Sequence, residues 1–360
     1  MRLWAIACGL WLVACGSTSS GLDDDDGSGG GGNPRNDAAI DPNGGDGGGG
    51  GGGGGGGSGD GGGGGGGSGS DAATTLQPLG NGGPGIEILR TDTTHLYWAR
   101  NDSSAIAIQR MPLAGGAIET LYTAPGWVLG LQVVGGVVYV AVTRDALNNY
   151  VGSIVSFPVT GGTPTTVATP MGVRGLVVDG GWIYYGDTLA STTGEARILK
   201  MPTTGGNPHF IARARANATP YEMSIDAGIL YFTDSLGVVQ VEVQTKQITD
   251  LVTNMIAPQM TIDDQYVYFV GCTGTCGYAT AYRVPRAGGA VEPLGMTPHR
   301  LRSGIDAIDD SLQWGSYVLS TTGGPETTLL DSQDPFAVVA TPPAFYFANK
   351  DTGDIYRVAR

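Results

Sequence analysis

The feature that most constrains this chain is an aromatic residue that follows an aspartate by five positions and recurs along the sequence. Five copies keep the aspartate: Asp92–Tyr97, Asp179–Tyr184, Asp226–Tyr231, Asp263–Tyr268 and Asp309–Trp314. Two more, Val134–Tyr139 and Thr341–Tyr346, have another residue in its place. The seven anchors are 42, 45, 47, 37, 46 and 32 residues apart. Self-similarity at this period is typical of an array of one supersecondary unit.

Each unit has the pattern of four short strands. In the third unit the candidate strands are GLVVD, WIYYGD, ARILKM and PHFIAR, and glycine pairs at 180–181 and 205–206 mark two of the turns. Alternating apolar positions, β-branched and aromatic residues, and Gly turns are strand and hairpin signals. No window keeps a 3.6-residue period, so no long helix is expected. The repeat therefore predicts an all-β fold, a seven-bladed β-propeller over residues 74–360, with six blades as the alternative.

The units resemble the YWTD-type propeller repeats of low-density-lipoprotein-receptor-like proteins. The segment YFTD at 231–234 is the best match, whereas YWAR, YYGD and YFAN depart from the motif. Motifs such as MPLAGG (111–116) and FPVTGG (157–162) are similar to those of bacterial secreted relatives. The resemblance covers residues 74–360 and implies the fold. It implies little about function, because propellers include binders, scaffolds and enzymes.

Closure of the ring is predicted at the N-terminal edge of the repeats. The last unit supplies only three strands before the chain ends at Arg360. The segment TTLQPL at 74–79 resembles the fourth strands of other units, such as VEPLGM at 291–296. We therefore expect residues 74–79 to pair with residues 354–358 and to cover an edge that would otherwise be exposed.

The N-terminus has the pattern of an exported, lipid-anchored protein. Arg2 and the apolar run 3–13 are typical of a secretory leader and too short to span a bilayer. Residues 12–15, LVAC, resemble a bacterial lipobox, which implies a signal peptide over 1–14 and acylation of Cys15. Gly16 in the next position weakly implies the outer membrane. The alternative is an ordinary signal peptide cut near Ala14, with Cys15 free. Residues 15–73 are then a disordered Gly- and Asp-rich tether, because they offer almost no apolar side chain to bury.

The charge, cysteine and histidine content indicates which partners, disulfides and metal sites to expect. Residues 74–360 carry 17 Lys and Arg against 24 Asp and Glu, a net charge of −7, so no nucleic-acid partner is expected. Cys272 and Cys276, four residues apart, predict a disulfide in an exported domain, with free thiols as the alternative. His95, His209 and His299 form no cluster with ligand spacing, so neither a metal site nor a cofactor is expected.

A binding site is expected on one face of the propeller. The second-to-third and fourth-to-first connections are the long, polar ones, and binding residues tend to lie on such loops. The start of each first strand should line the central channel at this face, which places Glu87, Arg174, Glu222 and Gln259 there. His299 and Arg302 lie near the sixth blade at the same face. Together these residues are the candidates for gripping a polar ligand; the alternative is that they are solvated charges in weak ion pairs.

The sequence predicts a non-catalytic binding module for a protein, peptide or glycan, held at the bilayer through acylated Cys15. We expect the protein to be a monomer. No catalytic residue can be assigned, because the chain contains no nucleophile elbow, zinc-protease motif or recognisable triad. Two alternatives remain: a propeller lyase or hydrolase that acts on an envelope or extracellular substrate, and a structural envelope scaffold. Seven-bladed lyases similar to virginiamycin B lyase use histidine and a metal, which the three scattered histidines match poorly.

Overall fold

The structure is a computed structural model that describes residues 76–102, 105–146, 149–188, 196–215, 218, 220–273, 279–296, 304–329 and 335–360. The predicted signal peptide, lipidation site and tether, residues 1–14 and 15–73, lie outside these residues, as do the first two residues of the predicted closing strand. The described part of the chain contains no helix, and so no apolar helix of a length that could cross a membrane.

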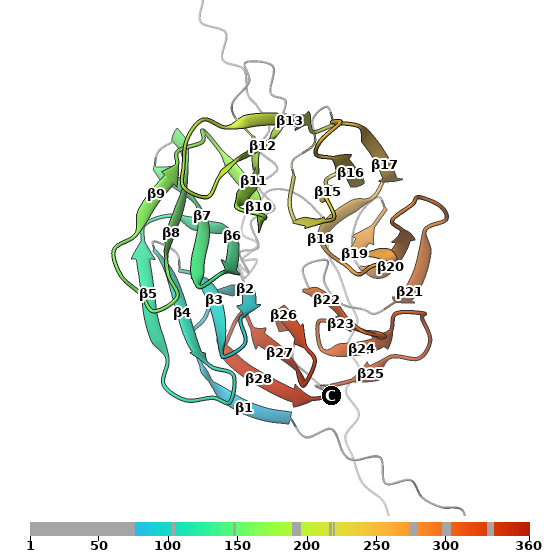
Figure 1. Ribbon diagram of the computed structural model, residues 1–360. Coiled ribbons are helices and arrows are strands. Elements are labelled where there is room, and N and C mark those ends of the chain that lie inside the picture. The colour runs from blue at the N-terminus through green and yellow to red at the C-terminus, as the bar shows by residue number, and fades with distance from the viewer. Residues whose placement is uncertain are drawn as a thin grey trace, which may run out of the picture. The chain divides into compact units, whose positions relative to one another are not determined.

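The described residues form 28 strands in seven antiparallel sheets of four. Figure 1 shows the sheets arranged radially around a central axis, which confirms the seven-bladed propeller. Blades 1 to 3 comprise β2 (Ile86–Thr91), β3 (His95–Asn101), β4 (Ile106–Pro112) and β5 (Glu119–Ala124); β6 (Trp127–Val134), β7 (Val137–Ala146), β8 (Asn149–Pro158) and β9 (Thr165–Ala168); and β10 (Val173–Asp179), β11 (Trp182–Asp187), β12 (Arg197–Pro202) and β13 (His209–Arg213).

Blades 4 to 6 continue the same order from the innermost strand outward. They comprise β14 (Met223–Asp226), β15 (Ile229–Asp234), β16 (Gly237–Glu242) and β17 (Ile248–Thr253); β18 (Ile256–Ile262), β19 (Tyr266–Cys272), β20 (Thr280–Pro285) and β21 (Glu292–Met296); and β22 (Ile305–Ile308), β23 (Ser311–Trp314), β24 (Tyr317–Ser320) and β25 (Thr327–Thr328).

Blade 7 joins the two ends of the described chain. Its strands are β26 (Pro335–Thr341), β27 (Ala344–Asn349), β28 (Asp354–Ala359) and, on the outer edge, β1 (Leu76–Asn81). Strand β1 pairs antiparallel with β28, from Leu76 opposite Val358 to Asn81 opposite Asp354. The predicted closure is confirmed, and Figure 1 shows β1 running along β28. Beyond the strand, the Gly82 amide donates to the Gly353 carbonyl oxygen at 2.9 Å, which extends the junction.

The core is divided into seven apolar clusters, one between each pair of neighbouring blades. The repeated tyrosine lies on the second strand and packs against the following blade. Tyr97 of blade 1, for example, packs with Val128 and Leu131 of blade 2, and Tyr231 of blade 4 packs with Met260 of blade 5. Burying each such ring contributes about 1.5–3 kcal/mol to the free energy of unfolding. The expectation that the tyrosine fills the space between blades is confirmed.

In blade 6, the sequence pattern Asp309–Trp314 places the anchor one residue too far along the chain. The hairpin of blade 6 closes at Ile308 and Ser311, so Asp309 and Asp310 form the turn itself. The place of the repeated tyrosine therefore belongs to Gln313, not to Trp314. Gln313 is fully buried, and its amide nitrogen lies 3.4 Å from the Tyr346 carbonyl oxygen of blade 7. Among the described residues, the cluster between blades 6 and 7 has only three buried apolar members, because an amide occupies the place of a ring.

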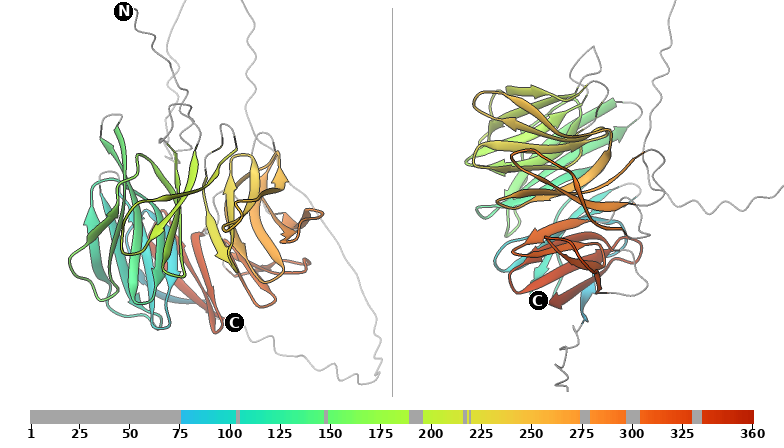
Figure 2. Two further views of the ribbon diagram at one scale, coloured as in Figure 1. Left: turned by 45° about the horizontal axis from the view of Figure 1, so that its top comes forward. Right: turned by 90° about the vertical axis from the view of Figure 1, so that its right-hand side faces the viewer.

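The two faces of the propeller differ in their connections. We call the face with the first-to-second and third-to-fourth turns the turn face, and the opposite face the loop face. The left view of Figure 2 shows the strands of neighbouring blades running between these two faces. Most of the segments 187–196, 213–220, 271–278 and 296–301, expected to be loops, either lie outside the described residues or border the gaps. Segment 143–152, also expected to be a loop, instead extends β7 and β8 as far as the pair Ala146 and Asn149.

Candidate functional site

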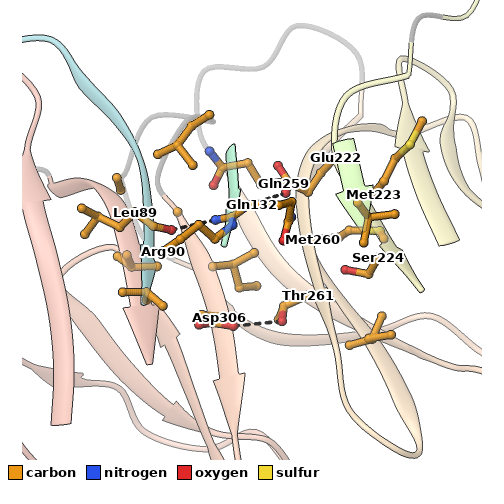
Figure 3. A pocket seen from close by; sticks show the side chains of 18 of the residues that line it. Leu89, Arg90, Gln132, Glu222, Met223, Ser224, Gln259, Met260, Thr261 and Asp306 are labelled. Carbon is orange, nitrogen blue, oxygen red and sulfur yellow. Dashed lines mark hydrogen bonds and ion pairs between the residues drawn. The ribbon is translucent and has the colours of Figure 1, made fainter. Parts of the chain in front are cut away.

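The candidate site is a cavity of about 290 Å³ on the propeller axis. The first strand of each blade is the innermost, and residues from all seven first strands line the cavity. Figure 1 shows these strands around the centre of the ring, and Figure 3 shows their side chains converging on it. The volume is at the lower end of the range for ligand pockets, which suits a single side chain or a small molecule.

Each blade contributes to the cavity the residue two positions before its hairpin anchor. We call these seven residues the channel ring: Arg90, Gln132, Val177, Ser224, Thr261, Asp306 and Val339. In every blade the ring residue pairs across the hairpin with the residue at the tyrosine position. Neighbouring strands place paired residues at the same level. The same hairpin register therefore puts the tyrosine side chains between the blades and the channel-ring residues at the axis.

Arg90 links two blades across the channel. One of its guanidinium nitrogens lies 2.9 Å from Glu222 Oε1 of blade 4, and another donates to the Leu89 carbonyl oxygen at 2.8 Å. Figure 3 shows the Arg90 side chain extending from β2 toward Glu222. The two side chains keep 28% and 32% of their surface exposed, so this ion pair remains open to a solute in the channel.

Asp306 is the second carboxylate of the channel. Its Oδ1 accepts a hydrogen bond from the Thr261 hydroxyl at 3.0 Å, and its Oδ2 accepts one from the Ala340 amide at 2.8 Å. The Ala307 amide also donates to Oδ1 at 3.0 Å. These donors come from blades 5, 6 and 7 and are all uncharged. They orient the carboxylate without neutralising it.

The two carboxylates share one nearby cation. Burial raises the pKa of Glu222, and Asp306 raises it further, whereas Arg90 acts in the opposite direction. Burial also raises the pKa of Asp306 against its three hydrogen bonds and the attraction of Arg90. Glu87, at the edge of the cavity, is matched separately: its Oε1 lies 2.6 Å from Lys350 Nζ, and its Oε2 accepts from Asn101. Among the described residues, the channel therefore holds one negative charge in excess when both carboxylates are ionised.

The structure places the predicted ligand-binding residues as follows. Glu222 and Gln259 line the cavity, together with Glu87. Arg174 lies in β10 beside a bulge between residues 174 and 176, and it is not among the cavity-lining residues. His299 and Arg302 lie outside the described residues, so their placement stays a prediction.

The disulfide between Cys272 and Cys276 stays a prediction. Cys272 is buried at the end of β19, and Cys276 lies outside the described residues. Within the described ranges, no group of three or more His, Cys, Asp or Glu side chains gathers at a distance suited to a metal ion. His95 begins β3 at the turn face, and His209 on β13 packs edge-on against Trp182 with ring centroids 5.7 Å apart.

Sequence reasoning identified none of the seven channel-ring residues, including Arg90 and Asp306. A signal was present, because the position two before the sequence anchor is polar in four units, Arg90, Gln132, Ser224 and Thr261. In blade 6 the misplaced anchor pointed to Ala307 instead of Asp306. Counting positions from the strand pairing of each hairpin would have identified both residues.

Comparison with known proteins supports the fold alone. No protein-family model and no curated protein matches the chain. Among solved structures, the extracellular domain of the putative one component system BT4673 from B. thetaiotaomicron has a TM-score of 0.56 at 12% identity, over 80% of this chain and 40% of that one. The computationally designed Ika8 protein has a TM-score of 0.53 at 11% identity, over 79% of this chain and 100% of that one.

A structure from a study of two prolyl endopeptidases has a TM-score of 0.51 at 13% identity, over 77% of this chain and 50% of that one. The extracellular domain of a one component system, a designed protein and a prolyl endopeptidase structure thus share this architecture. Because the same fold serves such different ends, the function has to be argued from the site.

Proposed function

We propose that the chain is a membrane-anchored lipoprotein whose propeller acts as a non-catalytic binding module for a protein, peptide or glycan. The observation that carries this proposal is the axial cavity, in which Arg90, Glu222 and Asp306 converge from three different blades. Charged groups held on rigid strands around a small cavity are suited to recognition, because they are oriented before a ligand arrives.

Exposed apolar side chains on the loop face support a protein or peptide partner. Trp127 begins the inner strand of blade 2 with 42% of its surface exposed, and Met171, two residues before β10 in blade 3, is 61% exposed. Both precede the innermost strand of their blade at the loop face, close to the mouth of the channel. Exposed Trp and Met are enriched in protein interfaces, so this rim is a suitable contact for a partner.

The proposed anchor is a lipid on Cys15, joined to the propeller by the 15–73 segment. Acylation at Cys15 and the 15–73 segment would hold the propeller on a tether with a root-mean-square span of roughly 40–45 Å. The proposed location is the cell envelope after export, most simply the outer membrane. A monomer on such a tether could search a wide volume for its partner.

The anchor is tested with the full-length chain in a bacterium that processes lipoproteins. Cys15→Ser should move the protein from the membrane fraction to the soluble exported fraction, because no acyl chain then holds it. A variant that remains membrane-bound would contradict lipid anchoring.

The binding role is tested by affinity capture from envelope extracts, with bait that carries either wild-type Glu222 or Glu222→Gln. We expect a protein, peptide or cell-wall fragment to be retained by the wild type and depleted on the variant. Turnover of an envelope substrate by the purified protein, in the absence of any retained partner, would replace the binding function with the enzymatic alternative.

A further inference from the structure

We propose that the axial cavity binds a single ammonium or guanidinium group, from a small amine or from the tip of a basic side chain that enters at the loop face. The inference rests on the proposed binding function and specifies its ligand. Its starting point is the charge on the channel: Arg90 faces two carboxylates, Glu222 and Asp306, and Glu87 is already matched by Lys350.

The charge balance selects the sign of the ligand. One added monocation makes the group of Arg90, Glu222 and Asp306 neutral, whereas an added anion would leave three negative charges against one positive charge in a cavity of about 290 Å³. An unpaired charge away from bulk water is strongly unfavourable. Among charged ligands, the described lining of the channel therefore favours a cation.

The geometry selects the type of cation. Arg90 shows that the cavity accepts a guanidinium in contact with Glu222 Oε1, at 2.9 Å. The lining also offers oxygen acceptors from uncharged side chains, including the Ser224 and Thr261 hydroxyls. An ammonium or guanidinium group carries several N–H donors and can use such acceptors together with a carboxylate.

A cation must compete both with protons and with Arg90. Among the described residues, the charged groups around the cavity are Glu87 and Arg90 on β2, Glu222 before β14, Asp306 on β22 and Lys350 after β27. Strands β6, β10, β18 and β26 contribute uncharged residues to the lining. Because the pKa values of Glu222 and Asp306 are raised, protonation neutralises the excess charge as the pH falls. Affinity for a cation should therefore rise with pH from about 4 to about 7.5.

The test is isothermal titration calorimetry on the full mature protein with n-butylammonium, and with n-butyrate as the probe of opposite charge. We expect butylammonium alone to bind, with heat that grows from pH 4 to pH 7.5. Asp306→Asn should weaken binding about tenfold or more, the loss typical of a charge-assisted contact. Asp310→Asn, on the same blade with a side chain 90% exposed, is the matched control and should leave binding unchanged.

A gain-of-affinity variant guards against misfolding. Arg90→Gln removes the internal competitor and should tighten butylammonium binding about tenfold, an effect that a damaged fold would not produce. Equal binding of butyrate, or wild-type affinity in both Asp306→Asn and Arg90→Gln, would overturn the inference.

Two short peptides distinguish the sources of the cation: acetyl-Gly-Lys-Gly-amide and its Gln counterpart. Tighter binding of the Lys peptide than of butylammonium assigns the site to a basic side chain, and the reverse order assigns it to a free amine. If the channel ignores all of these cations while envelope capture still retains a partner, this inference fails and the proposed function stands. If capture also fails, both are rejected.

Discussion

Asp306 and Gln313 face each other across the hairpin of blade 6, in the register where the other six blades pair a channel-ring residue with a tyrosine. Blade 6 thus differs from the other blades at two paired positions. The acid Asp306 faces the axis, and the amide of Gln313 faces blade 7. Gln313 is fully buried, and its Oε1 has no hydrogen-bond partner among the described residues. Blade 6 thus combines a charged channel position with an apolar cluster of only three buried members among the described residues.

Replacing Gln313 with methionine should stabilise the protein. Methionine has a similar length, fills the same space and removes a buried acceptor without a partner, a group that costs about 1–3 kcal/mol. We expect a gain of about 1 kcal/mol, which is roughly 2–4 °C in melting temperature. Differential scanning calorimetry measures the change.

The control is the same substitution at Gln109, whose Oε1 accepts a hydrogen bond from the buried Trp98 indole at 2.9 Å. Gln109→Met should destabilise, because it leaves that donor unpaired. If both variants lose stability to the same extent, the Gln313 amide contributes more than its long contact with Tyr346 indicates.

The fold could be predicted in detail because large aromatic residues and Gly turns mark each repeat. Their spacing stays recognisable even where the residues between them differ. The predicted closure at residues 74–79 also held, since a propeller with three strands in its last blade leaves an edge to cover. Blade 6 was misphased because Asp309 satisfies the sequence pattern while lying in the turn itself, with a positive φ of 52°.

The channel was harder to predict, because β-bulges interrupt the first strands. In β2 the register shifts between Ile86 and Ile88, and in β18 between Ile256 and Gln259. A bulge changes which side of a strand faces the axis, so counting four or five residues back from the anchor fails for some blades. Glu222 and Gln259 were reached in this way, but Arg174 was not placed in the cavity. Arg90 and Asp306 lie on the regular part of their strands, and identifying them required the register of the hairpin.

Removing the hydroxyl of Tyr97 should cost about 1–2 kcal/mol of unfolding free energy, since the hydroxyl donates to Asp92 Oδ2 at 2.6 Å in a partly exposed site. Tyr139→Phe is the matched control, because Val134 stands in place of the aspartate in blade 2, and it should change stability by less than about 0.5 kcal/mol. Urea denaturation at pH 7 compares the two variants. Equal losses would show that the ring alone, without its acid partner, sets the contribution of this position.

The same hydrogen bond gives an alkaline signature. Burial and Asp92 raise the pKa of Tyr97 to about 12, above the value near 10 expected in the unfolded chain. The folded state therefore holds its proton longer, and the stability that Tyr97 provides is lost as the pH rises from about 10 to about 12. Over this range the stability difference between wild type and Tyr97→Phe should shrink; a constant difference would contradict the raised pKa.

Deletion of residues 76–81 should unfold or strongly destabilise the propeller. The strand supplies the outer partner of β28, and its Leu76 packs with Phe347 and Val358 in the cluster between blades 6 and 7. A drop of about 10 °C or more in melting temperature is expected, measured by circular dichroism. Deletion of residues 45–65 within the Gly-rich segment is the control and should shift the melting temperature by less than about 2 °C. Similar effects of the two deletions would contradict closure by β1.

Neutralising both channel carboxylates should change how stability depends on pH. The pKa values of Glu222 and Asp306 in the folded protein are raised above their unfolded values. The folded state therefore binds more protons than the unfolded state above about pH 4, and the free energy of unfolding falls as the pH rises through the folded pKa values. Relative to wild type, the double variant Glu222→Gln/Asp306→Asn should gain stability between pH 4 and pH 7.

Urea denaturation at several pH values measures this difference. The double variant Asp264→Asn/Asp310→Asn, at exposed positions, should run parallel to wild type. If the channel variant also runs parallel, the two carboxylates do not carry the excess charge assigned to them.

The central claim is that the loop face, not the turn face, receives a partner, and strand β6 offers a matched pair of sites to test it. Trp127 begins β6 at the loop face with 42% of its surface exposed, and Val134 ends the same strand at the turn face with 40% exposed. A photo-cross-linking amino acid placed at either position in the full-length, membrane-anchored protein, followed by irradiation of intact cells, compares the two faces directly. We predict a discrete cross-linked product from position 127 and none from position 134; the same products from both positions, or a product from 134 alone, would contradict the account.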